Sequence, residues 1–277
     1  MHSPRRVCFE NMTSPLPSIF LNHGGGPLPL LGDSLHMNLV KHLTGISGTI
    51  TKPRVILLAS AHWETKEPTF VSSSEPGLLY DYYGFSAESY RIQYPAKNSL
   101  QVVERARSLL EAGGLKTHVA PKRGYDHGVF VPLKLMYPDA GIPVVQVSLP
   151  ISRDPILVYR MGQLLSPLRG EGVLILGSGL SYHNLQSFFS VDSSKSSRSK
   201  QFDTALKSAC LSKENRQGSL CEWENFPHAR YCHPTEEHLM PLLFVAGAAD
   251  REPCRVIYED ELMGAKISGF QFGRATM

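Results

Sequence analysis

Four apolar runs rich in β-branched residues most constrain the fold of this 277-residue chain. Each is bounded by proline, glycine or polar residues, and each predicts a strand that is buried on both faces of a sheet. The runs are PSIFLN at 17–22, PRVILLAS at 53–60, IPVVQVSL at 142–149 and GVLILGSG at 172–179, and CRVIYED at 254–260 is a fifth candidate.

Segments with helical periodicity separate these strands. The three clearest are 98–114, capped by Asn98 or Ser99, 154–168, capped by Asp154, and 235–249, capped by Thr235. Strands that alternate with helices predict a parallel sheet with helices on both faces. We therefore expect an α/β fold, a single three-layer αβα domain around a central, mainly parallel (mixed) sheet.

The pattern predicts one domain over residues 17–277. Residues 1–16 contain two arginines but no apolar run, so we expect a flexible tail and not a secretory signal. The segment SVDSSKSSRSK at 190–200 interrupts the pattern without dividing it, and its composition is typical of a mobile surface loop.

Charge and cysteine content exclude some function classes. The 28 basic and 25 acidic residues leave a net charge of +3, which is too small and too dispersed to indicate a nucleic-acid partner. No run approaches the ~20 apolar residues of a spanning helix, so no membrane partner is expected. An odd number of cysteines without CxxC spacing indicates free thiols in a reducing compartment, and we expect a cytoplasmic protein. The cysteines are Cys8, Cys210, Cys221, Cys232 and Cys254.

Five of the eleven histidines lie beside small or glycine residues at a predicted strand or helix end. They are His23, His62, His127, His183 and His238. Ligands usually bind beyond the carboxyl ends of parallel strands, which share one edge of the sheet. Neutral imidazole binds zinc and iron, and three protein ligands with open positions are typical of a catalytic metal site. The histidines therefore indicate a metal site at this edge.

Six motifs carry a resemblance to a known family. They are LNHGGGP, SAHWE, YDYYGF, YDHGVFVPLKLMYPDAGIPVVQVSL, GSGLSYHNL and HPTEEHLMPLLFVAGAA. In this order they resemble the motifs of the class III extradiol ring-cleaving dioxygenases, and within that class the DOPA 4,5-dioxygenase branch. The resemblance extends from about residue 17 to the C-terminus, as the motif positions show.

The resemblance implies that His23 and His62 bind the metal and that the third ligand is His238. The other candidates in the last motif are His233, Glu236 and Glu237. Glu237 would require the expected helix to rotate by about 100°. An all-histidine set is neutral and would leave the ion its full positive charge. The resemblance implies one divalent metal ion, with Fe(II) expected for activity and Zn(II) plausible as the bound ion.

The same resemblance suggests roles for other residues. His183 corresponds to the family's acid–base residue and is a possible further metal ligand. His127 corresponds to a histidine that contacts a substrate hydroxyl, although a structural turn histidine bonded to Asp126 is an alternative. We expect an aromatic wall around a flat substrate, formed by Trp63, Tyr82, Tyr83 and Phe85.

The implied reaction is extradiol cleavage of a DOPA-like catechol with O2, which gives a semialdehyde. The expected partners are thus a small aromatic diol and O2. Two alternatives stay open: a zinc-dependent hydrolase with a three-histidine site, and a protein that binds a catechol or metal without turnover. The sequence does not indicate an oligomeric state.

Overall fold

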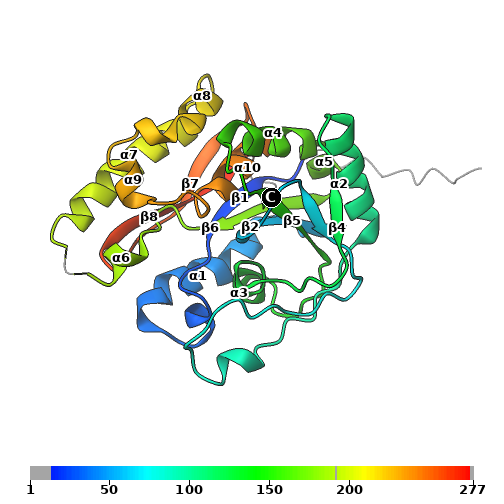
Figure 1. Ribbon diagram of the computed structural model, residues 1–277, viewed down its shortest axis with the longest axis horizontal. Helices are drawn as coiled ribbons and strands as arrows, with labels where there is room; N and C mark the ends of the chain where they lie inside the picture. The colour runs from blue at the N-terminus through cyan, green and yellow to red at the C-terminus, as the bar shows by residue number, and fades with distance from the viewer. Residues whose placement is uncertain (1–13, 191, 275–277) are drawn as a thin grey trace, which may run out of the picture.

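The computed structural model describes residues 14–190 and 192–274 (Figure 1). Its centre is an eight-stranded sheet with the order β4-β3-β5-β2-β6-β1-β8-β7. The strands are β1 (Ser18–Asn22), β2 (Val55–Thr65), β3 (Thr69–Val71), β4 (His118–Ala120), β5 (Val144–Pro150), β6 (Val173–Gly179), β7 (Cys254–Leu262) and β8 (Ala265–Phe272).

The mainly parallel, mixed sheet predicted from the sequence is confirmed. Strands β5, β2, β6 and β1 are parallel neighbours, whereas β8 pairs antiparallel with β1 and β7, and β3 pairs antiparallel with β5. All five predicted strands are present. Strands β3, β4 and β8 are not among the predicted strands. The first two have only three residues each, too few to show a periodicity.

Helices cover both faces of the sheet. Helices α2, α4 and α10 pack on one face, and α1 and α3 on the other (Figure 1). The helices are α1 (Met37–Ile46), α2 (Leu100–Ala112), α3 (His127–Met136), α4 (Pro155–Leu165), α5 (Pro167–Gly170), α6 (Leu185–Phe188), α7 (Lys195–Leu211), α8 (Arg216–Cys221), α9 (Ala229–Cys232) and α10 (Met240–Ala248). Short 3₁₀ helices are η1 (Leu28–Leu30), η2 (Ser34–His36), η3 (Ser47–Thr49), η4 (Ser89–Arg91) and η5 (Trp223–Asn225).

Two of the predicted helix starts are confirmed by their capping bonds. The hydroxyl of Ser99, not Asn98, accepts from the Val102 N–H at the start of α2, at 3.4 Å. The carboxylate of Asp154 accepts from the Ile156 N–H at the start of α4, at 2.9 Å. Both bonds satisfy an N–H that has no partner within its helix.

The predicted start of the third helix is wrong. Helix α10 begins at Met240, and the preceding residues form turns in which the N–H groups of Leu239 and Met240 bond to the Glu236 carbonyl. Thr235 is therefore not its cap. Glu237 and His238 lie in this turn segment, so a rotation of the helix cannot decide between them.

The expectation of a mobile loop at 190–200 is also wrong in its second half. Helix α7 begins at Lys195 and packs against β8. Its buried Phe202 and Leu206 lie beyond the Ser/Lys-rich segment, and this tertiary packing outweighs the polar composition of the first turns.

The ordered fold begins before residue 17. Leu16 is fully buried, and its N–H bonds to the Arg169 carbonyl at 3.2 Å. Residues 1–13 of the expected tail lie outside the described residues. In the described part of the chain, no helix combines the length and the apolar character needed to cross a membrane.

Candidate metal centre

The five singled-out histidines meet at the carboxyl edge of the sheet. The ring centroids of His23 and His62 are 4.9 Å apart, and those of His62 and His127 are 3.9 Å apart. The rings of His183 and His238 stack at 3.4 Å, and His238 lies 4.9 Å from His62. All five line one cavity of about 460 Å³.

Three of these rings present nitrogens at the spacing that a metal ion requires. The ligand atoms of His23, His62 and His238 all lie within 4.8 Å of one another. The Nε2 atoms of His23 and His62 are 3.1 Å apart. Two nitrogens that are each ~2.1 Å from one ion, at ~90–110°, would lie about 3.0–3.4 Å apart. The donor set therefore fits a divalent transition metal.

His62 lies in an irregular part of β2. Ala59 pairs with Val147 on β5, and the next pair is Glu64 with Leu149, so five steps along β2 span two along β5. Such bulges re-aim side chains and are frequent beside active sites. The irregularity places the His62 ring at the strand end, among the other histidines.

The end of β6 holds two of the candidate ligands. The Gly179 carbonyl accepts from the His23 N–H, and the Leu180 N–H donates to the His238 carbonyl, both at 3.1 Å. A Cβ atom on Gly179 would lie only 2.1 Å from that His238 carbonyl oxygen. Only glycine therefore allows the His238 backbone to approach the strand this closely.

Hydrogen bonds behind the rings determine which nitrogen faces the cavity. The Ser178 hydroxyl donates to the Gly128 carbonyl and lies 3.2 Å from His23 Nδ1, so it must accept the Nδ1 proton. The Glu237 carboxylate lies 3.0 Å from His238 Nδ1 and can only accept there. In both candidate ligands the Nε2 lone pair is therefore free to bind a metal.

Two carboxylates that the sequence analysis did not assign to the site hold the remaining rings. Asp81 accepts from His127 Nδ1 at 2.9 Å and lies 3.8 Å from His62 Nδ1. Glu237 also lies 3.3 Å from His183 Nδ1. The candidate ligands are all histidines, but these two carboxylates add negative charge around them. The signal was present, since Asp81 lies within YDYYGF and Glu237 precedes His238.

Burial and hydrogen bonding set the protonation of the site. Burial lowers the pKa of His23 and His238 well below 6.5 and that of His62 to about 3. These rings are therefore neutral near pH 7, which is the form that binds a metal. For Glu237 and Asp81 burial acts to raise the pKa, but hydrogen bonds from the histidines outweigh it and keep both carboxylates ionised.

The His127 ring is bonded to Asp81 and not to Asp126. Its backbone N–H and its ring Nδ1 both donate to Asp81, at 2.9 Å. Asp126 instead accepts from Ser60 at 2.7 Å and from Arg123 at 3.0 Å. The alternative in which the His127 ring is bonded to Asp126 is therefore wrong.

His233, a rival third ligand, lies outside the cluster. Its ring is fully buried, and its Nε2 lies 3.0 Å from the Ser181 carbonyl. Glu237 faces the Nδ1 atoms of His183 and His238.

The structure places two of the four residues of the expected aromatic wall in the cavity. Tyr82 and Phe85 line the cavity, but Trp63 and Tyr83 do not. Trp63 is buried beneath the Arg123 guanidinium, 4.5 Å from the ring centroid, because adjacent strand residues face opposite sides and His62 faces the cavity. Tyr83 is 92% exposed, pointing into solvent.

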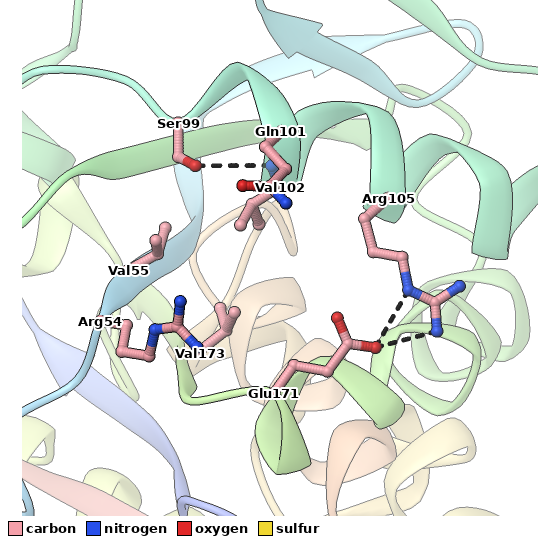
Figure 2. Close-up of a pocket in the computed structure, with 8 residues that line it drawn as sticks. All are labelled: Arg54, Val55, Ser99, Gln101, Val102, Arg105, Glu171 and Val173. Atoms are coloured by element: carbon pink, nitrogen blue, oxygen red, sulfur yellow. Dashed lines mark hydrogen bonds and ion pairs between the residues drawn. The ribbon is translucent and has the colours of Figure 1, made fainter. Parts of the chain in front are cut away.

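A second cavity, of about 230 Å³, lies where β2 and β6 begin, at the opposite edge of the sheet from the histidines (Figure 2). Its charged side chains include Arg105 and Glu171, which form an ion pair with Arg105 Nη2 and Glu171 Oε1 2.8 Å apart. Ser99 in its wall caps α2. No cluster of potential metal ligands among the described residues lies in this cavity.

Comparison with known proteins identifies the family. Residues 29–271 match the family model described as the catalytic LigB subunit of aromatic ring-opening dioxygenase. A protein from Hapsidospora irregularis named dioxygenase tasH is 40% identical over 93% of this chain and 85% of its own length. The 4,5-DOPA dioxygenase extradiol of Mirabilis jalapa is 34% identical over 84% of this chain and 87% of its own, and that of Escherichia coli K12 is 33% identical over 90% and 92%.

A solved structure supports the same relationship. The crystal structure of an uncharacterized protein from Escherichia coli K12 superimposes with a TM-score of 0.77 and 30% identity, covering 93% of this chain and 100% of that one. The chain belongs to the LigB family of aromatic ring-opening dioxygenases. The family resemblance predicted from the six motifs is thereby confirmed. Members of this family use a metal, and the histidine cluster is the potential site for it.

Proposed function

We propose that this protein cleaves a catechol with O2 in the extradiol manner, using Fe(II) held by His23, His62 and His238. The observation that carries the proposal is the convergence of these three ligand atoms within 4.8 Å on the floor of an apolar cavity. DOPA is the reference substrate, because several relatives are named for it. A bound divalent ion would supply Lewis acidity to the diol and, if it is iron, the redox chemistry that O2 requires.

In this proposal His183 accepts a proton from one catechol hydroxyl and later returns it. Glu237 supports this role, because it faces Nδ1 at 3.3 Å and so favours a free lone pair on Nε2. The carboxylate would also stabilise the imidazolium that forms, as in other histidine–carboxylate pairs. His127, held in the same way by Asp81 at 2.9 Å, orients the second hydroxyl.

The proposed reaction is balanced without a further reductant. The carbon–carbon bond next to the diol breaks, and both atoms of O2 enter the product. One oxygen atom forms the aldehyde and the other completes the carboxyl group on the carbon that carried a hydroxyl. The four electrons that reduce O2 come from the ring carbons, so the diol is the only electron donor.

Anaerobic loading with Fe(II), followed by oxygen uptake against a catechol panel that includes DOPA, tests this proposal. We expect stoichiometric oxygen consumption and a yellow ring-opened product with the iron form only. Zinc competes well for nitrogen ligands, so a purified sample can contain zinc and still be inactive. Equal oxygen uptake by the zinc form, or none with iron and any catechol, would refute the mechanism.

We further propose a cytoplasmic location. It is supported by the thiols of Cys210, Cys221, Cys232 and Cys254, which are all free. Cys8 lies outside the described residues. Free, partly or fully buried thiols are typical of reducing compartments. Fractionation of the source cells checks this location.

A further inference from the structure

The walls of the histidine-lined cavity are almost entirely apolar. Above the histidines they are formed from two sides, by the segment that follows β1 together with Phe85, and by α6 with the β7–β8 turn. Representative side chains are Leu28, Phe85, Leu185, Phe188, Leu262 and Met263. Among the described residues, no Lys, Arg, Asp or Glu lines this cavity.

The two other polar side chains of the wall are already engaged. The Tyr82 hydroxyl donates to the Ser89 carbonyl at 2.8 Å and so presents only its ring to the cavity. His36 Nε2 accepts from the Gly25 N–H at 3.0 Å, and its Nδ1 lies 2.7 Å from the Asp33 carboxylate. Among the described residues, polar recognition by side chains is thus confined to the five histidines on the floor.

The mouth of the cavity is apolar as well. Leu185 is 58% exposed and Phe189 is 80% exposed, and both contribute to its lining. A substituent that extends from a ring bound at the histidines would cover these side chains. Covering exposed apolar area is favourable only for a substituent that needs no polar partner there.

Because the polar side chains lie on the floor of the cavity and apolar side chains form its walls and mouth, we infer the substrate class. The site selects a catechol whose ring substituent is an alkyl or aryl group over one whose substituent ends in a carboxylate. The inference rests on the proposed function in one respect, that the occupant is a catechol. The diol faces the histidine floor, and the substituent lies along the apolar walls. A carboxylate such as that of DOPA would lose water there and find no cation, which makes it the poorer ligand.

Binding to the zinc-loaded protein tests the inference without turnover. Calorimetry under nitrogen compares 4-propylcatechol, 3-(3,4-dihydroxyphenyl)propanoate and DOPA, which share the diol and a three-carbon chain. We expect a Kd for 4-propylcatechol that is lower by roughly tenfold or more, given the cost of burying an unpaired charge. Equal or tighter binding of either carboxylate would overturn the inference.

The outcomes separate the inference from the proposed function. If the carboxylates bind as well as 4-propylcatechol and the iron form cleaves them, the substrate class is wrong and the proposed function stands. If 4-propylcatechol is preferred but no catechol is cleaved by the iron form, the proposed function is wrong and the selectivity stands. If none of the three binds, both are wrong.

A charge added to the wall provides the second test. Leu185→Arg places a guanidinium at the mouth, where it can pair with a carboxylate. The ratio of the Kd of a carboxylate ligand to the Kd of 4-propylcatechol should therefore fall by roughly tenfold. Leu211→Arg is the matched control, because Leu211 is 48% exposed on α7, outside the cavity. It should leave the preference unchanged. The same shift in both variants, or in neither, contradicts the assigned role of the wall.

Discussion

At the scale of single residues, two carboxylates organise the histidine cluster from behind. Asp81 faces Nδ1 of His127, and Glu237 faces Nδ1 of both His183 and His238. Each carboxylate can only accept a hydrogen bond, so it selects the tautomer that leaves Nε2 free. A histidine in this tautomer can therefore serve as a metal ligand or as a base, depending on whether its Nε2 atom faces the metal or the substrate.

The proposed division between base and ligand predicts different losses in two variants. His183→Gln should retain the metal and lower the rate of ring cleavage by roughly 10²–10⁴, the usual contribution of an acid–base group. His62→Ala should lose metal and activity together, because one of three ligands is gone. Metal content and oxygen uptake measured on both variants check this. If His183→Gln also loses its metal, His183 is a fourth ligand.

The carboxylate behind the ligands predicts an effect on metal affinity. Glu237→Gln removes the charge that orients His238 and should weaken metal binding by roughly 10–100-fold, as for other groups that support a ligand. Glu236→Gln is the matched control, since that side chain pairs with Arg230 at 2.5 Å. Competition with a fluorescent chelator measures both affinities. Equal affinities of the two variants would show that Glu237 does not support the ligand.

At the scale of elements, the site depends on how strand ends approach one another. The Gly179 carbonyl bonds to the His23 N–H, while the next residue bonds to the His238 carbonyl. Strand β6 therefore joins the first and the last of the candidate ligands. His238 lies in the turns before α10, where its carbonyl bonds to the Leu180 N–H after β6. The predicted helix beginning at residue 235 did not include these turns.

Substitution of Gly179 tests this close approach. Gly179→Ala places a Cβ atom against the His238 carbonyl, so overpacking should lower the free energy of unfolding by about 1–3 kcal/mol and weaken metal binding. Gly45→Ala is the control, because Gly45 lies in α1 with open space around it and alanine favours a helix by about 0.5–1 kcal/mol. Urea unfolding measures both. A Gly179→Ala protein as stable as the wild type would contradict the packing argument.

At the scale of the whole molecule, one buried and one half-buried histidine make stability depend on pH. Burial lowers the pKa of His233 to about 3 and that of His42, which stacks on Tyr258, to about 4. On unfolding both return towards 6.5, so between these values the unfolded state binds more protons than the folded state. Stability therefore rises with pH over this window and is lost as the pH falls below about 6.5.

We expect the metal-free protein to show this dependence in urea unfolding at pH 7, 6 and 5. The buried His233 ring alone contributes a slope of up to about 1.4 kcal/mol per pH unit. His42→Gln, which cannot titrate, should show a shallower slope than the wild type. Identical slopes for the two proteins would exclude His42 as a contributor.

The sequence by itself determined the fold class and the residues of the histidine cluster. The apolar runs and the helical periodicity between them are local patterns, and the chirality and burial of parallel strands leave few ways to arrange them. Because parallel strands share a carboxyl edge, residues near the carboxyl ends of β1, β2 and β6 had to meet, although His23 and His183 are far apart in the chain.

Only the tertiary structure decided which side chains face the cavity and what holds the rings. Trp63 lies outside the cavity because its side chain packs beneath Arg123 while that of His62 faces the cavity. Lys195 begins a helix where the composition indicated a loop. The pairing of Asp81 with His127, and the joining of Leu185 with Met263 in one wall, link residues 46 and 78 positions apart. Such contacts depend on how distant segments pack, and no local period in a single sequence records that packing.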